Sequence, residues 1–301
     1  MADKRDEAAS YDEGGATFDR LAEKYTGEYA KFACEWVGVH AGDRALDAGT
    51  GTGLVARELG ARVGGSGRVL GVDLSEGMLQ VARARGRRLG LVPHVIDFRQ
   101  GDVEGLELPD GGFDLTTSLF VLRHLPNPKQ AVDEMFRVTR PGGRVVVGVG
   151  DGAPILSPRG FRYRAGRLVA NLRKRMGIRL EAPAYMSSLL DQYLPPGLDG
   201  TEGSHDFGRS ARGTLRRFFE EAGFTEVEDA WRGHIDVIPD PQEFWDLQMY
   251  HCSPARYRIR GAPPEAVEAL REEFMRGAHE VLDRGGTLLY ATGTTFVKGK
   301  V

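Results

Sequence analysis

A glycine-rich loop near residue 50 carries the clearest chemical signal in the chain. Residues 45–59 read ALDAGTGTGLVAREL, so Gly49, Gly51 and Gly53 alternate directly after a short apolar run and before a helical stretch. Glycine lets such a loop turn tightly and lets bare backbone approach a ligand, with the N-terminus of the next helix behind it. The pattern indicates a loop that cradles a ligand, and a purely structural turn is the alternative.

An acidic residue beyond this loop narrows the kind of ligand. Asp73 closes the next β-like run, about 20 positions after the glycines, where dinucleotide-binding sites place a carboxylate that binds ribose. The glycines follow the spacing GxGxG, however, and not the dinucleotide spacing GxGxxG. We therefore predict a nucleoside-containing ligand, and the alternative for Asp73 is a capping role before Ser75.

Composition restricts the class of protein. With 301 residues, of which 41% are hydrophobic, the chain can bury a large core, and a net charge of -3 gives no global excess of positive charge for nucleic-acid binding. Two cysteines, Cys34 and Cys252, are too few for a disulfide framework and show no zinc-binding spacing. No apolar run approaches the roughly 18 to 20 residues of a membrane span, so we expect a cytoplasmic protein without one.

The elements that must position the loop follow from a regular alternation. A first amphipathic helix is predicted from Thr17 to about Gly38, and strand-like runs then alternate with helical stretches, which is typical of parallel βαβ units. Ser75 is expected to cap one helix, and Asn127 with Gln130 resembles a capping box at another. The seven predicted strands lie at 44–49, 68–74, 94–102, 113–120, 142–150, 224–231 and 287–299, with helices between them and at 213–223, 241–250 and 264–284.

The pattern loosens after residue 150 and suggests four parts of the chain. Residues 1–15 are expected to form a disordered tail, 16–150 a cofactor-binding core, 151–210 an inserted substrate cover, and 211–301 the C-terminal completion of the core sheet with additional helices. An arginine-rich helix at 161–176 could dock an anionic substrate, a membrane surface or RNA. We favour a covering helix that buries its apolar stripe and solvates its arginines.

Four ordered motifs connect these parts to a known family. LDAGTGTG, VLGVDLSEGML, FRQGDVEGLELPDGGFD and SLFVLRHLPNPKQAVDEMFRVTRPGGR occur in this order between residues 46 and 144. In order and spacing they resemble the motif series of the class I S-adenosylmethionine-dependent methyltransferases, within the group that includes the ubiquinone and menaquinone biosynthesis enzymes. The resemblance is strong over residues 15–150, weak over 151–210, and returns in general layout at the C-terminus.

This resemblance implies a fold and a cofactor site. The implied fold is a doubly wound, mostly parallel seven-stranded sheet of the Rossmann-like methyltransferase type, with the last strand antiparallel and an inserted helical cover. Asp73 would accept hydrogen bonds from both ribose hydroxyls, Asp102 would bind the adenine unless it only begins a turn, and Leu119 would face the transferred methyl group. The residues implied to bind S-adenosyl-L-methionine are Asp47, which orients the loop, and Gly49, Gly51, Gly53, Asp73, Leu74, Asp102, Val103 and Leu119.

Methyl transfer makes modest demands on the remaining residues. An in-line displacement depends mainly on positioning and exclusion of water, although an oxygen or carbon acceptor often needs a base. His124 and His205 are the first candidates for that base, ahead of His234 and His251. We predict no metal, because no cluster of metal-binding carboxylates is evident.

The expected reaction is methylation of a small organic acceptor, such as a quinone precursor or a secondary metabolite, and nucleic acid is not the expected partner. Three other functions stay open at this point. The chain could methylate RNA or protein, it could be a nicotinamide-dependent oxidoreductase, or it could bind the cofactor without catalysis. The glycine spacing and the segment GDVEGLELPDGGFD speak against the oxidoreductase.

Overall fold

The computed structural model describes residues 14–151, 179–194, 211–251 and 253–301. The chain divides into two compact units. The first unit comprises Met1–Asp151, Gly203–Ala230 and Thr294–Val301, and the second comprises Gly152–Glu202 and Trp231–Gly293. The second unit therefore takes in more of the chain than the 151–210 segment that the sequence suggested as a cover.

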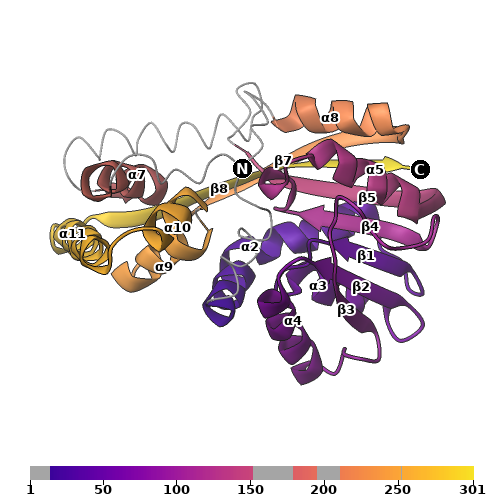
Figure 1. The fold of residues 1–301 in the computed structure, drawn as a ribbon, viewed down its shortest axis with the longest axis horizontal. Helices are drawn as coiled ribbons and strands as arrows, with labels where there is room; N and C mark the ends of the chain where they lie inside the picture. The colour runs from indigo at the N-terminus through magenta and orange to yellow at the C-terminus, as the bar shows by residue number, and fades with distance from the viewer. Residues whose placement is uncertain (1–13, 152–178, 195–210, 252) are drawn as a thin grey trace. The chain divides into compact units, whose positions relative to one another are not determined.

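Strands and helices alternate along the chain as the sequence predicts (Figure 1). The strands are β1 (Arg44–Ala48), β2 (Arg68–Asp73), β3 (Ile96–Gln100), β4 (Phe113–Leu119), β5 (Thr139–Gly150), β6 (Arg179–Glu181), β7 (Thr225–Ile238) and β8 (Thr287–Lys300). The helices are α2 (Gly15–Val37), α3 (Leu54–Val63), α4 (Glu76–Arg88), η1 (Leu122–His124), α5 (Pro128–Val138), α7 (Ala182–Tyr193), α8 (Ala211–Ala222), α9 (Pro241–His251), α10 (Ser253–Arg260) and α11 (Pro264–Asp283).

The sheet confirms the predicted topology. Its strand order is β3-β2-β1-β4-β5-β8, and β8 also pairs with β7 and with the short β6. Strands β1 to β5 pair in parallel, whereas β8 runs antiparallel to β5, with Phe296 opposite Gly148. The seven predicted strands are all present, and β6 is an addition that the sequence analysis did not foresee.

Helices cover both faces of the sheet in the first unit, as a doubly wound fold requires (Figure 1). Helices α2, α3 and α4 bury one apolar cluster, which includes the fully buried Leu59, Leu79 and Leu115. Helices α5 and α8 bury the other, which includes Met135 and Phe219. Both clusters keep the strands rigid and fix the positions of the loops at the strand ends.

Local sequence explains most helix boundaries. Helix α2 ends at Gly38, whose φ of 77° suits glycine, and the Ser75 hydroxyl caps α4 by accepting a hydrogen bond from the Met78 N–H. The prediction of a capping box at α5 is wrong, because Asn127 occupies the N-cap position but its side chain makes no capping hydrogen bond. Glu104 takes its place: its carboxylate accepts from the Asn127 N–H at 2.5 Å, and its carbonyl accepts from the Gln130 side chain at 2.6 Å.

The second unit has its own core of aromatic side chains. Tyr185, Phe244 and Trp245 all pack against Phe274 of α11, at ring-centroid distances of 5.2 to 5.3 Å. Helix α7 lies in the 151–210 segment, for which the sequence predicted only the arginine-rich helix. The arginine-rich stretch 161–176 and the first 13 residues of the expected tail lie outside the described residues.

Candidate active site

The carboxyl ends of β1, β2 and β4 bring the predicted cofactor residues together. Asp47 of β1 lies opposite Gly71 of β2 on one side and Thr117 of β4 on the other. The loop after β1 is tied to β2, because the N–H groups of Gly49 and Thr50 both donate to the Val72 carbonyl, at 2.7 and 2.9 Å. Ligands of open α/β sheets bind at this edge, so the strand order itself locates the site.

Glycine is required at the three positions of the loop for different structural reasons. All adopt positive φ, and a side chain on Gly49 would collide with Val121, whose Cγ2 would lie 2.2 Å from the added Cβ. A side chain on Gly53 would meet Phe98 at 2.9 Å, whereas a Cβ on Gly51 would meet nothing within 4 Å. Gly49 and Gly53 are therefore needed for packing, and Gly51 faces the open space in which a ligand can approach the backbone.

Asp73 is held rigidly beside that space. Its Oδ2 accepts from the Gly51 N–H at 2.7 Å and its Oδ1 accepts from the Ser75 N–H at 3.0 Å. Burial raises the pKa of Asp73 above 3.8, while these bonds, one from Leu74 and the nearby charge of His124 oppose the rise. A carboxylate has about four acceptor positions, so the three backbone bonds leave it the capacity to accept a hydrogen bond from a ribose hydroxyl.

Asp47 orients the loop from within the core, as the sequence analysis proposed. Its carboxylate accepts from the Thr50 hydroxyl at 2.7 Å and from the Thr117 hydroxyl at 2.8 Å, and the residue is 1% exposed. Burial raises the pKa of Asp47 to about 6, although the two hydroxyl bonds lower it. The group therefore supports the loop and does not reach the ligand space directly.

The predicted adenine-binding loop begins at the end of β3. The Gly101 N–H donates to the Asp73 carbonyl at 3.0 Å, which joins this loop to the residue predicted to bind the ribose. The Asp102 carboxylate accepts from the Glu104 N–H at 3.0 Å, so Asp102 does begin a turn, and Val103 is buried. The turn role and the predicted adenine role are compatible, because a carboxylate offers about four acceptor positions.

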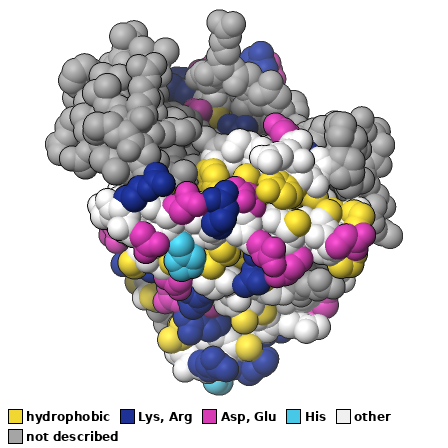
Figure 2. All heavy atoms as spheres, turned by 90° about the vertical axis from the view of Figure 1, so that its left-hand side faces the viewer, with side chains coloured by type: hydrophobic (Ala, Val, Ile, Leu, Met, Phe, Trp, Pro, Cys, Tyr) yellow, Lys and Arg dark blue, Asp and Glu magenta, His cyan; other side chains and the backbone are white. Residues whose placement is uncertain are grey.

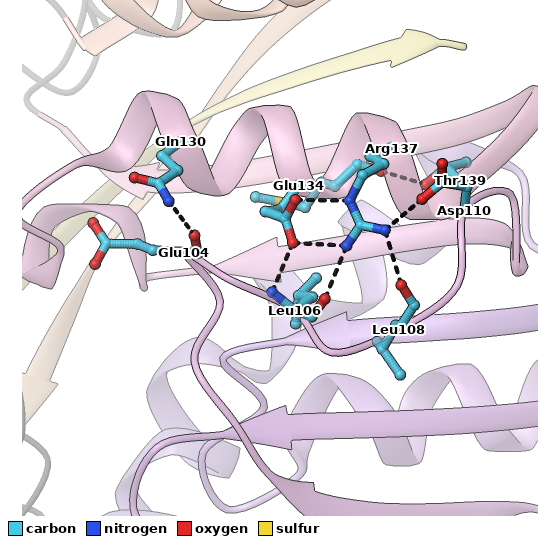
Figure 3. Close-up of polar contacts among 9 residues, drawn as sticks. Glu104, Leu106, Leu108, Asp110, Gln130, Glu134, Arg137 and Thr139 are labelled. Carbon is cyan, nitrogen blue, oxygen red and sulfur yellow. Dashed lines mark hydrogen bonds and ion pairs between the residues drawn. The ribbon is translucent and has the colours of Figure 1, made fainter.

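Helix α5 clamps the same loop through Arg137, which the sequence analysis missed (Figure 3). The guanidinium donates to the carbonyls of Leu106 and Leu108, each at 2.8 Å, and to Asp110 at 2.6 Å. It also binds both oxygens of Glu134, which in turn accepts from the Leu106 N–H at 2.7 Å. Arg137 holds the pKa of Glu134 below its usual range, so the clamp stays charged near neutral pH.

The chain turns sharply where β4 ends, next to the glycine loop. Leu119, predicted to face the methyl group, is buried at the last position of β4, and Phe120 adopts a φ of 64°. Positive φ is rare for a bulky side chain and is typical of constrained functional sites. Phe120 contacts the buried Tyr29 of α2 edge-on at 6.0 Å, and the turn sets Val121 against Gly49.

The candidate bases are distributed over both units. His124 ends η1, which follows the carboxyl end of β4, and its charge when protonated would lower the pKa of Asp73. His205 lies outside the described residues, and the side chain of His251 is not described either. His234 belongs to the second unit, where its Nε2 lies 2.9 Å from Oδ2 of Asp236. His124 is thus the one sequence candidate that the described residues place near another predicted site residue.

A buried ion pair behind the glycine loop was also missed. Arg57 of α3 donates to the Thr52 carbonyl at 2.6 Å and to Asp19 of α2 at 2.9 Å. Asp19 lies on the buried face of α2, four residues after the buried Gly15 and six before the buried Tyr25. That interruption of the apolar stripe is the signal that could have identified it.

These residues fit an S-adenosylmethionine ligand. The open backbone at Gly51 and the rigid carboxylate of Asp73 are what a nucleoside with a polar tail requires, and the clamped loop after β3 adjoins them. The described residues contain no group of three or more His, Cys, Asp or Glu side chains arranged to hold a metal ion. The glycine loop, Asp73 and the clamped loop after β3 are suited to binding and orienting an organic cofactor.

Comparisons with known proteins agree with this geometry. Residues 46–147 match a family model described as a methyltransferase domain. The chain is 30% identical over 209 residues to the ubiquinone/menaquinone biosynthesis C-methyltransferase UbiE of Escherichia fergusonii. This alignment covers 66% of this chain and 73% of the relative.

A second relative and a solved structure are also similar to this chain. UbiE of Pseudomonas fluorescens is 40% identical over 119 residues, covering 40% of this chain and 46% of the relative, so that match spans about half of the relative's length. The fold is similar to that of the YcgJ protein from Bacillus subtilis, with a TM-score of 0.54, 18% identity, and coverage of 91% of this chain and 98% of the other. The residues of the glycine loop, β2 and the clamp all lie within the matched range.

Proposed function

The chain belongs to the class I S-adenosylmethionine-dependent methyltransferases of the ubiquinone/menaquinone biosynthesis type, and we propose that it transfers a methyl group from S-adenosylmethionine to a small organic acceptor. A quinone precursor or a secondary metabolite fits this class. The single observation that carries the proposal is the pairing of Asp73 with the Gly51 N–H beside open backbone, because it combines a ribose acceptor with a close-approach loop.

The residues of the site would act mainly by positioning. S-adenosylmethionine supplies an electrophilic methyl group on a sulfonium, so the protein has to align it with an acceptor and keep water away. Asp73 would fix the ribose, the loop after β3 would hold the adenine, and Leu119 would present an apolar surface at the methyl group. His124 would serve as base where the acceptor has to lose a proton.

Two observations support a small acceptor over a nucleic acid. The relatives named above are C-methyltransferases of quinone biosynthesis. On the described part of the face in Figure 2, Lys and Arg side chains are interspersed with Asp and Glu. Among the described residues, Arg276 of α11 is paired with both Glu273 and Glu280. Nucleic-acid binding relies on a continuous basic surface instead.

We further propose that the protein works in the cytoplasm, which its sparse use of cysteine supports. None of the helices in the described ranges is long and apolar enough to cross a membrane.

The proposal is tested by following the methyl group. Purified protein is incubated with methyl-labelled S-adenosylmethionine and a fractionated extract of its host, and label is counted in small molecules, RNA and protein. We expect label in the small-molecule fraction, and much less label with the Asp73→Ala variant at the same cofactor concentration. Label in RNA or protein would overturn the small-acceptor proposal, and cofactor binding without any label would favour a binding protein that does not catalyse.

A further inference from the structure

A carboxylate of the first helix lies buried between two guanidinium groups of other helices. Asp19 of α2 is 4% exposed, and its Oδ1 accepts from Nη2 of Arg57 in α3 at 2.9 Å. Its Oδ2 forms an ion pair with Nε of Arg85 in α4, also at 2.9 Å, and Arg85 is further paired with Glu23. One side chain of α2 is thereby tied to the two helices that follow β1 and β2.

The same Arg57 reaches the glycine loop. Its Nη1 donates to the Thr52 carbonyl at 2.6 Å, between Gly51 and Gly53, and its backbone N–H donates to the Gly53 carbonyl at 2.9 Å. Arg57 of α3 therefore fixes the loop through the Thr52 carbonyl, and its guanidinium is fixed in turn by Asp19 of α2. A carbonyl fixed toward Arg57 cannot turn into the ligand space, where it would repel the carboxylate of an amino-acid ligand.

We propose that Asp19 and Arg57 are positioning residues that couple the seating of α2 to cofactor binding. The ion pair is buried on both sides, with side chains 6% and 8% exposed, so bulk water and salt screen it little. A cofactor that orders the loop fixes Arg57, and a fixed Arg57 is a better partner for Asp19. By linkage, docking of α2 then strengthens cofactor binding by the same factor.

This inference rests on the proposed function only in taking S-adenosylmethionine as the ligand of the glycine loop. A purely structural ion pair would also stabilise the fold, but it would leave cofactor affinity unchanged in the folded protein. The two roles are separated by measuring binding and not stability alone.

The test compares four forms of the full chain. Affinity for S-adenosylhomocysteine is measured by calorimetry for the unaltered protein, Asp19→Asn, Arg57→Lys and Glu28→Gln, at a temperature where circular dichroism shows each to be folded. Glu28→Gln is the matched control, because Glu28 lies on the same helix in an exposed pair with Lys31. Amide hydrogen exchange over Gly15–Val37 is followed with and without the ligand.

We expect Asp19→Asn and Arg57→Lys to bind about tenfold more weakly, within the range usual for coupled sites, and Glu28→Gln to bind normally. The ligand should slow exchange in α2 of the unaltered protein but not of Asp19→Asn, and about 0.5 M salt should not abolish the difference. Affinity within twofold, with α2 still protected by the ligand, would overturn the inference.

Two further outcomes are also decisive. Absence of binding by the unaltered protein would overturn the proposed function, and this inference with it. If Asp19→Asn does not fold, Arg57→Lys decides alone, because lysine keeps the charge beside Asp19 but lacks the forked donor that reaches both Asp19 and Thr52.

Discussion

At the scale of single residues, Asp73 connects the cofactor loop to the ligand. Its carboxylate fixes the Gly51 N–H and is predicted to bind the ribose. Replacing it with alanine removes charged hydrogen bonds worth about 1.5 to 3 kcal/mol, so we expect roughly 10- to 150-fold weaker binding of S-adenosylhomocysteine in calorimetry. Asp97→Ala, at an exposed acid of β3, is the control, and an unchanged affinity for Asp73→Ala would contradict the ribose role.

Asp47 gives a pH dependence whose sign follows from its raised pKa. Its pKa is about 6 in the folded protein and 3.8 ordinarily, so the folded state binds more protons between these values. The free energy of unfolding contributed by this group therefore falls as pH rises from about 4 to about 6, by up to roughly 3 kcal/mol.

Asparagine at position 47 lacks this titration. We expect the stability of Asp47→Asn relative to the unaltered protein to increase by up to roughly 3 kcal/mol between pH 4 and pH 7, in urea unfolding at each pH. Asp97→Asn, which removes an exposed carboxylate of β3, is measured beside it as the control. A difference for Asp47→Asn that does not change with pH would mean that Asp47 keeps an ordinary pKa.

At the scale of elements, different glycines of the loop are expected to serve packing and cofactor binding. Gly49→Ala forces Cβ against Val121, so we expect a clear drop in the unfolding midpoint. Gly51→Ala meets no neighbour, so it should cost only the 1 to 2 kcal/mol of a left-handed alanine while weakening cofactor binding strongly. Thermal unfolding and calorimetry on both variants check this, and normal binding by a folded Gly51→Ala would contradict the assigned role of Gly51.

The elements of the first unit were predictable because their signals are local. Apolar runs, the cap at Ser75 and the glycine at position 38 mark strand and helix ends within a few residues. Helix α7 was not predicted because prolines and glycines follow it closely in the sequence, although Met186, Leu189 and Leu190 have a helical spacing and are buried.

The candidate site was predictable only where residue type and spacing carry a signal. The glycines and Asp73 follow from spacing, whereas the supporting contacts join distant positions. Arg57 and Asp19 are 38 residues apart, and Arg137 binds backbone carbonyls, which leave no trace in residue type. A charge on an apolar helix face was the single available clue to the first of these pairs.

At the scale of the whole molecule, the cofactor-binding unit depends on residues far along the chain. Residues 294–300 pair antiparallel with β5, and Phe296 and Val297 are fully buried. Deleting Thr294–Val301 should therefore unfold the first unit and abolish binding of S-adenosylhomocysteine, although no predicted cofactor residue is removed. Circular dichroism and calorimetry check this, with Lys300→Ala as a control that leaves the strand in place. A truncated chain that still binds would show that the core closes without β8.

The antiparallel strand also has a consequence for how the protein is made. A ribosome delivers β1 to β5 first, and the partner of β5 only after the whole second unit has been synthesised. Until then the nascent sheet presents an unpaired edge at Val145, Val146 and Val147, which is a template for pairing with other chains. The first unit therefore completes its folding only after the second unit has been synthesised, and its synthesis includes an interval in which chaperone protection is valuable.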